Sequence, residues 1–295
     1  MAQVFSILRH HCKQLLRGVG QVFFLENALS GLLLLIGIGI NSLPMLLSAI
    51  LGAIASTYTA MLLRYDRTEI ERGLYGFNGT LVGIAVLLFY GLSHFSLTTV
   101  AVGAMVTTPV AHLLNHRCRI PAYTFPFVAT VWAILLLTRA GVLPPLPLTD
   151  QETALPAERL DLLSSLDYDL GQVMFQADSL LTGLLFMLAI VIASRDLALY
   201  TIVGVASSLV VTLFDLFPIA EINAGLYGYN AVLVAMAVGD KSARGILKIV
   251  VGVLLTIALQ FAGIRLGITT LTAPFVFATW LVLIASHLVA TKKQA

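Results

Sequence analysis

The sequence predicts an all-α polytopic membrane protein, and three observations support this fold class. Hydrophobic residues make up 59% of the 295 residues and charged residues only 11%, with a mean hydropathy of +0.96. A soluble domain carries about 25% charged residues, so most of this chain cannot face water. The apolar residues gather in segments near the ~20-residue length of a membrane-spanning helix. The second half of the chain also repeats motifs of the first half in the same order.

Five apolar segments in each half are expected to be helices that cross the bilayer, which gives ten spans. They lie near residues 24–41, 43–63, 74–92, 97–115 and 122–140, and then near 175–194, 197–217, 226–240, 246–264 and 269–290. Several of these segments are short or interrupted by Gly and Pro. We therefore expect some of them to be broken or re-entrant half-helices.

Two further segments complete the predicted order of elements. Residues 1–19 mix apolar and basic residues and lack the unbroken apolar core and cleavage site of a signal peptide, which predicts an amphipathic helix. Residues 141–170 are rich in Pro, Asp and Glu and are expected to form a linker between the halves. The predicted domains are thus residues 1–140 and 171–295, joined by this linker.

The distribution of Lys and Arg predicts the sidedness of the chain. In a ten-span topology, 14 of the 17 basic residues fall on the side that also holds both termini, and only Arg139, Arg159 and Arg265 fall on the other. Basic loops concentrate on the cytoplasmic side of a membrane. Both termini are therefore expected in the cytoplasm and residues 141–170 in the periplasm. The absence of a signal peptide and the compact linker favour a bacterial inner membrane.

Charge and cysteine content exclude several classes of protein. A dispersed net charge of +2 does not indicate nucleic-acid binding. Cys12 and Cys118 both lie in basic stretches that are predicted to be cytoplasmic, where structural disulfides are rare. His112 and His116 are four residues apart, but the sequence shows no carboxylate or third ligand beside them, so no metal site is predicted. No cofactor motif and no nucleophile–base constellation is found, which argues against an enzyme.

The repeat is carried by three motifs that recur at nearly constant offsets of 151, 152 and 148 residues. They are GQVFF (20–24) and GQVMF (171–175), LYGFN (74–78) and LYGYN (226–230), and TFPFVATVW (124–132) and TAPFVFATW (272–280). An odd number of spans in each half places the second copy upside down relative to the first. Inverted repeats of this kind place a binding site near the bilayer midplane, built from both copies.

The residues in these motifs predict an uncharged solute. The predicted spans hold no Lys or Arg at mid-membrane depth, and Glu26, Asp178 and Asp215 lie at span ends. Ion-coupled pumps keep ionisable groups inside the membrane because the coupling ion needs them. The repeated motifs offer neutral polar side chains next to aromatic and aliphatic ones. This chemistry suits a small, neutral, hydrogen-bonding solute that moves down its gradient.

The doubled GQVxF, LYGFN/LYGYN and TxPFV motifs resemble those of the urea transporter family, and the resemblance covers essentially the whole chain. It implies passive transport of urea through one pore in each protomer of a homotrimer, with an apolar slot at each mouth and a polar middle. The alternatives are a channel for a short amide, ammonia or water, or a membrane-embedded enzyme or scaffold.

The resemblance also assigns roles to individual residues. One slot would use Val22, Phe77, Leu81 and Phe175, the other Phe24, Val173, Tyr229 and Leu233; Gln21 and Gln172 would offer amide oxygens at the slots, and Thr124 and Thr272 would form the central pair. Gln172 departs from family members that carry Glu there, and Tyr229 departs from Phe77 in the first copy. The hydroxyl of Tyr229 is expected either to line the slot or to bind elsewhere.

Two further pairs of residues are expected to support the pore. Asn78 and Asn230 recur next to the slots and are expected to satisfy backbone groups of broken helices. Pro126 and Pro274 lack an N–H, so if these segments are helical, the carbonyls four residues earlier lose their donor. Those carbonyls, of Ala122 and Thr270, are then expected to face the pore and accept from urea.

Overall fold

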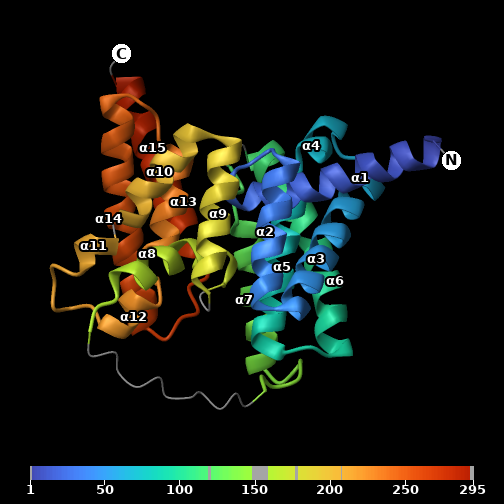
Figure 1. Ribbon diagram of the computed structural model, residues 1–295, viewed down its shortest axis with the longest axis horizontal. Coiled ribbons are helices and arrows are strands. Elements are labelled where there is room, and N and C mark those ends of the chain that lie inside the picture. The colour runs from blue at the N-terminus through green and yellow to red at the C-terminus, as the bar shows by residue number, and fades with distance from the viewer. Residues whose placement is uncertain (1, 119–120, 148–158, 177–178, 207, 293–295) are drawn as a thin grey trace. The chain divides into compact units, whose positions relative to one another are not determined.

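The computed structural model describes residues 2–118, 121–147, 159–176, 179–206 and 208–292, and the regular structure in these ranges is helical (Figure 1). Two compact units are present. Unit 1 comprises Met1–Ala154 and Leu184–Ser194, and unit 2 comprises Leu155–Gly183 and Arg195–Ala295.

Unit 1 holds the helices of the first half of the chain and most of one helix of the second half. These are α1 (Ala2–Gly20), η1 (Gln21–Phe23), α2 (Ala28–Asn41), α3 (Leu43–Leu62), α4 (Arg67–Arg72), α5 (Gly76–Tyr90), α6 (His94–His112), the π-helix η2 (Leu113–Cys118), α7 (Phe125–Arg139) and, from Leu184 on, α9 (Leu180–Ala193). The Ser30 hydroxyl of α2 donates to the Ala189 carbonyl of α9 at 2.7 Å. The segment of α9 therefore packs with helices that precede it by about 150 residues.

Side-chain caps define where the helices of unit 1 begin. The Asn27 side chain accepts from two amides in the first turn of α2, and Asp66 does the same for α4. Ser93 forms a reciprocal capping box with Ser96 at the start of α6. Each of these caps satisfies backbone donors that have no partner within the helix.

Small residues allow α3 and α5 to pack closely at the centre of unit 1. A Cβ atom added to Gly52 of α3 would lie 2.0 Å from the Gly79 carbonyl oxygen of α5, so the two backbones are in direct contact. The Ser48 hydroxyl of α3 donates to the Gly83 carbonyl of α5 at 2.8 Å. Close backbone approach through small residues is how membrane helices associate where lipid offers no hydrophobic driving force.

Unit 2 holds the corresponding helices of the second half. These are α8 (Leu162–Gly171), η3 (Gln172–Met174), α10 (Arg195–Ala206), α11 (Ser208–Val211), α12 (Ile219–Asn223), α13 (Tyr229–Val238), α14 (Ala243–Arg265) and α15 (Ala273–Lys292). The predicted linker 141–170 is thus helical from Leu162 on, while its residues 148–158 lie outside the described residues. Helix α8 leads into the second GQVxF motif as α1 leads into the first.

Each of the ten predicted spans contains a helix, but few of these helices are long enough to cross a bilayer alone. Leu43–Leu62, His94–Cys118 and Ala243–Arg265 meet the length and hydropathy required of a complete span, among the residues that the structure describes. A fourth is added if Val4–Phe23 and Ala28–Asn41, which meet at a 74° bend, are one broken span. The other apolar helices are shorter, and the ten-span arrangement stays a prediction.

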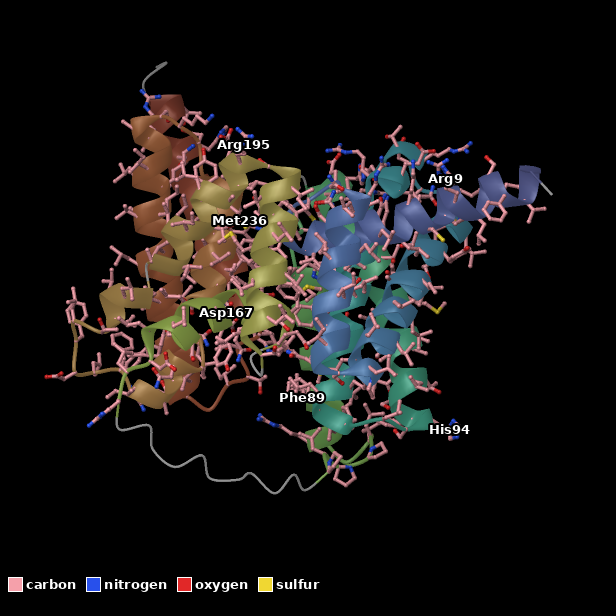
Figure 2. The ribbon with its side chains drawn as sticks, viewed as in Figure 1. Arg9, Phe89, His94, Asp167, Arg195 and Met236 are labelled. Carbon is pink, nitrogen blue, oxygen red and sulfur yellow. The ribbon has the colours of Figure 1, made fainter. Side chains whose placement is uncertain are left out.

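The ends of unit 1 differ in the residues they carry. Figure 2 shows Arg9 of α1 and His94, the first residue of α6, at opposite ends of this unit. The charge distribution along the sequence predicts the same separation, since Arg9 belongs to a segment expected in the cytoplasm and the turn before His94 to one expected on the other side.

Candidate functional site

The GQVxF motif adopts one backbone conformation in both units. A 3-10 turn, η1 or η3, follows the preceding helix and ends on an aromatic residue in the left-handed region. This residue is Phe24 with φ of 60° in unit 1 and Phe175 with φ of 58° in unit 2. For a residue with a Cβ atom this conformation costs about 1–2 kcal/mol. Its presence at the same motif position in both units indicates that the surrounding structure holds the turn in this conformation.

The glutamine of the same motif is tied to a backbone carbonyl in both units. Gln21 donates from Nε2 to the Arg72 carbonyl at 3.0 Å, and Gln172 donates to the Ala224 carbonyl at 3.1 Å. Because this bond uses the amide nitrogen, the carboxamide oxygen points away from that carbonyl and keeps its capacity to accept. Gln21 is buried and Gln172 is half-buried.

The Asn78 side chain bonds both the segment before α7 and the first turn of α7. Its Nδ2 donates to the Tyr123 carbonyl at 3.1 Å, and its Oδ1 accepts from the Phe127 amide at 3.0 Å. Tyr123 lies in the left-handed region with φ of 45°. Asn78 therefore caps α7 from α5, whereas Thr124, at the N-cap position itself, makes no side-chain capping bond.

Asn230 repeats this arrangement in unit 2. Its Nδ2 donates to the Leu271 carbonyl at 3.2 Å, and its Oδ1 accepts from the Phe275 amide at 3.3 Å. Leu271 has φ of 50°, like Tyr123 in unit 1. The amide nitrogen also donates to Oε1 of Gln260 at 3.2 Å, a partner that the repeated motifs did not predict.

The expectation for the prolines was wrong. Pro126 and Pro274 are the second residues of α7 and α15, where a helix needs no donor and proline is tolerated. The Ala122 carbonyl accepts from the Phe125 amide at 3.0 Å and the Thr270 carbonyl from the Ala273 amide at 3.0 Å. Neither carbonyl has lost its donor. Thr124 and Thr272, the predicted central pair, are both buried and directly precede these helices.

One cavity of unit 1 brings predicted pore residues together. It has a volume of about 360 Å³ and is lined by Gln21, Phe24, Glu69, Leu74, Phe77, Ala111, Asn115, His116, Pro121, Ala122 and Tyr123. Phe24 and Phe77, which were assigned to different slots, thus share one cavity, with Gln21 beside them. The Tyr123 ring contacts the Phe24 ring edge-on at 6.1 Å. Val22 and Leu81 are buried and do not line this cavity.

In unit 2 the hydroxyl that distinguishes Tyr229 from Phe77 is bound to the backbone. It donates to the Leu271 carbonyl at 2.5 Å, and Tyr229 is 5% exposed. Val173 and Leu233 are fully buried, and Phe175 is half-buried. The Tyr229 hydroxyl thus bonds a backbone carbonyl, and a place for Tyr229 in the slot stays a prediction.

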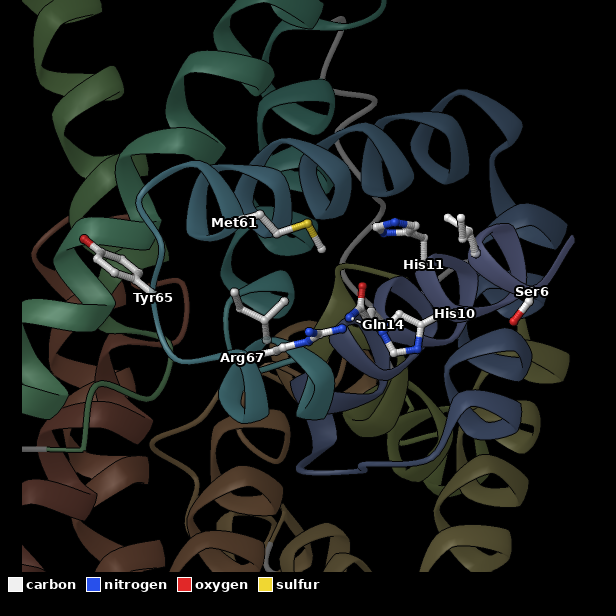
Figure 3. Close-up of a pocket in the computed structure, with 9 residues that line it drawn as sticks. Ser6, His10, His11, Gln14, Met61, Tyr65 and Arg67 are labelled. Atoms are coloured by element: carbon white, nitrogen blue, oxygen red, sulfur yellow. Dashed lines mark hydrogen bonds between the residues drawn. The ribbon is translucent and has the colours of Figure 1, made fainter. Parts of the chain in front are cut away.

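A larger cavity of unit 1 contains no predicted pore residue. It has a volume of about 560 Å³ and is lined by Ser6, Ile7, His10, His11, Gln14, Met61, Tyr65, Arg67 and Ile70 (Figure 3). Gln14 and His10 are hydrogen-bonded at 2.9 Å, and the His11 ring stacks on Tyr58. The first contact lies within α1, and the second packs α1 against α3.

Sequence reasoning missed two features. Glu69 of α4 lies beside His112 and His116, so the view that these histidines lack a carboxylate partner was wrong. Asp169, in the predicted linker, is fully buried and accepts from the Gly228 amide at 3.0 Å. A signal for Glu69 was present, because a Glu stands six residues before the tyrosine of both LYG motifs.

Comparison with known proteins gives a consistent result along the chain. The family model described as "Urea transporter" matches residues 12–287. Urea transporter 1 of Rattus norvegicus is 29% identical over 238 residues, which cover 76% of this chain and 62% of the rat protein. Urea transporter 1 of Ovis aries is 32% identical over 237 residues, with the same coverage. The alignment thus spans less than two thirds of the length of these relatives.

Proposed function

This chain belongs to the urea transporter family, and from that premise we propose that it conducts urea passively across the membrane through a pore in each protomer. Proteins of this family are integral membrane proteins that transport a solute, not enzymes. The proposal takes the substrate from the names of the matched relatives. What supports it in this chain is the chemistry of the repeated motifs.

Urea sets clear requirements for a pore. It is flat, with four N–H donors along its edges and one carbonyl acceptor. Removing its water is costly unless each donor finds an acceptor, while the two faces tolerate apolar walls. A pore for urea therefore needs aromatic or aliphatic walls together with a line of oxygen acceptors.

The observation that carries the proposal is the 360 Å³ cavity of unit 1. The rings of Phe24 and Phe77 supply apolar walls, and Gln21 supplies a carboxamide whose nitrogen is already bonded to the Arg72 carbonyl. The remaining oxygen of Gln21 is an acceptor of the kind that a urea N–H requires. The cavity thus combines both requirements in one place.

The remaining assignments form part of the same proposal. The second half contributes Gln172, Val173, Phe175, Tyr229, Leu233 and Thr272, and the first half adds Val22, Leu81 and Thr124. Asn78 and Asn230 act on the backbone and not on urea, because both ends of each carboxamide bind main-chain groups. Inverted five-span halves, a homotrimer, cytoplasmic termini and a bacterial inner membrane complete the proposed arrangement.

The central pair is tested by urea flux into proteoliposomes with Thr124→Leu and Thr272→Leu. Each substitution removes a hydroxyl and adds bulk, so we expect urea flux to fall toward that of protein-free vesicles. Thr98→Leu is the matched control, because Thr98 is exposed on α6 and its hydroxyl donates to the His94 carbonyl of the same helix. Unimpaired flux in both Thr124→Leu and Thr272→Leu would remove the central-pair assignment. A short amide, ammonia and water, measured in the same vesicles, define the selectivity.

A further inference from the structure

Three potential metal ligands meet at the rim of the 360 Å³ cavity of unit 1. Glu69 of α4, His112 at the end of α6 and His116 of η2 each offer a ligating atom, and these atoms all lie within 4.8 Å of one another. Nε2 of His116 is 3.1 Å from a Glu69 carboxylate oxygen. Glu69 and His116 both line the cavity that holds Gln21, Phe24 and Phe77.

Two tyrosines hold this cluster in place. The Tyr75 hydroxyl donates to Oε2 of Glu69 at 2.6 Å and lies 3.1 Å from Nδ1 of His112. The Tyr65 ring stacks on the His112 ring with centroids 3.8 Å apart and an angle of 9°. Groups that orient the ligands in this way are the usual outer shell of a metal site.

The backbone at His116 is unusual. Residues Leu113–Cys118 form a π-helix, a conformation found in well under 1% of residues and often at functional sites. The wider turn changes the direction of the side chains that follow His112. The ring centroids of His112 and His116 lie 4.3 Å apart.

Unit 2 contains the same framework without the histidines. Tyr227 is hydrogen-bonded to Glu221, as Tyr75 is to Glu69. The Phe217 ring contacts Tyr227 and Phe261 at 4.9 and 5.2 Å, as the Tyr65 ring contacts Tyr75 and His112. By this contact pattern Phe261 of unit 2 is the equivalent of His112 of unit 1. Arg265, four residues after Phe261, is then the equivalent of His116.

The comparison between the units separates architecture from ligand chemistry. The Glu–Tyr pair occurs in both units, so it belongs to the repeated fold and is not specific to the proposed metal site. The two histidines are particular to unit 1, where they are added to a carboxylate that the framework already positions. Two imidazoles and one carboxylate leave open coordination positions for water, the ligand set of many zinc sites. Imidazole ligands favour zinc, nickel and copper over magnesium and calcium.

We propose that Glu69, His112 and His116 bind one divalent transition-metal ion, and that an ion bound there obstructs the cavity and lowers urea flux. The ion replaces the contact between His116 and Glu69 and takes water at its open positions. Because the side chains of Glu69 and His116 are 24% and 41% exposed, the ion can enter from solvent. The effect on flux rests on the proposed function, whereas binding of the ion does not.

Binding is measured first, on the full-length chain after removal of any affinity tag. Co²⁺ is added and its visible absorption is recorded, followed by displacement with Zn²⁺. We expect one Co²⁺ per chain and its release by Zn²⁺. His112→Phe combined with His116→Arg copies the residues of unit 2 into unit 1 and is expected to abolish the Co²⁺ spectrum. Tyr75→Phe keeps the ligands and should weaken the affinity about tenfold.

Flux is then measured in proteoliposomes with and without Zn²⁺, each variant being compared with its own metal-free rate. Zn²⁺ is expected to lower wild-type urea flux, chelation to restore it, and the double variant to be insensitive. His10→Ala with His11→Ala, in the other cavity of unit 1, is the control and should keep full sensitivity.

The outcomes separate the two proposals. A wild-type chain that shows no Co²⁺ spectrum, or Zn²⁺ inhibition that persists in the His112→Phe/His116→Arg variant, overturns the metal site. A wild-type chain that binds Co²⁺ but conducts no urea overturns the proposed function and leaves the binding site standing.

Discussion

Asn78 is the residue whose removal tests the architecture of the site most sharply. It lies 1% exposed on α5 and bonds the Tyr123 carbonyl at 3.1 Å and the Phe127 amide at 3.0 Å. Asn78→Ala removes both bonds. A buried polar group that loses its partner costs about 1–3 kcal/mol. Tyr123 lines the 360 Å³ cavity, where water can replace the lost donor. We therefore expect Asn78→Ala to lower the free energy of unfolding by about 2–3 kcal/mol.

The same substitution is expected to lower urea flux. Asn78 fixes the left-handed turn at Tyr123 and the first turn of α7, and Thr124 lies between them. Loosening this junction moves the hydroxyl of the proposed central pair. Flux should therefore fall in Asn78→Ala even where the protein stays folded.

Unfolding in mixed detergent micelles and urea flux in proteoliposomes measure the two effects. Asn115→Ala is the matched control for stability, because Asn115 is exposed and its side chain accepts from the Ala122 amide at 2.8 Å. It should cost less than about 1 kcal/mol. If Asn78→Ala destabilises no more than Asn115→Ala and conducts urea normally, the assigned role of Asn78 is refuted.

Three further predictions follow from individual contacts. Tyr229→Phe removes one of the donors to the Leu271 carbonyl and should cost about 0.5–1.5 kcal/mol of unfolding free energy with urea flux retained; abolished flux would place the hydroxyl in the pore. Hydrogen bonds, first that from Thr68, lower the pKa of Asp66 from its usual 3.8, so its stabilisation of α4 is present above that pH and is lost as pH falls through the lowered pKa; thermal unfolding of Asp66→Ala should lack this acid dependence. Gly52→Ala places a Cβ atom 2.0 Å from a carbonyl oxygen and should destabilise by at least about 1–3 kcal/mol in detergent; wild-type stability would contradict the close packing.

Local sequence patterns predicted the positions of many helices and of the repeated motifs, because these features depend on residues that are close together in the sequence. Each of the ten predicted apolar segments contains a helix, and the repeated LYGFN and LYGYN motifs located two asparagines that make equivalent bonds. Helix length was harder to predict. The apolar run near 74–92 reads as a complete span, but the helix occupies only Gly76–Tyr90, since hydropathy does not show where a glycine-rich turn ends and the helix begins.

The remaining features depend on contacts between distant residues. Glu69 lies 43 and 47 residues before its histidine partners, and no periodicity connects α4 with the end of α6. The left-handed turn at Phe24 was not predicted because phenylalanine gives no local signal for it. The error at Pro126 came from the predicted start of the helix. The span was predicted to begin near residue 122, whereas α7 begins at Phe125, so Pro126 lies in the first turn and does not interrupt the helix.

Passive transport of urea is tested by urea flux in proteoliposomes under an imposed ion gradient. Purified wild-type protein is reconstituted, and urea uptake is followed with and without an imposed proton or sodium gradient. For passive transport we expect uptake that is faster than in protein-free vesicles and that stops when the urea concentrations inside and outside are equal, whatever the ion gradient. Accumulation of urea above the outside concentration, or uptake no faster than in protein-free vesicles, would contradict it.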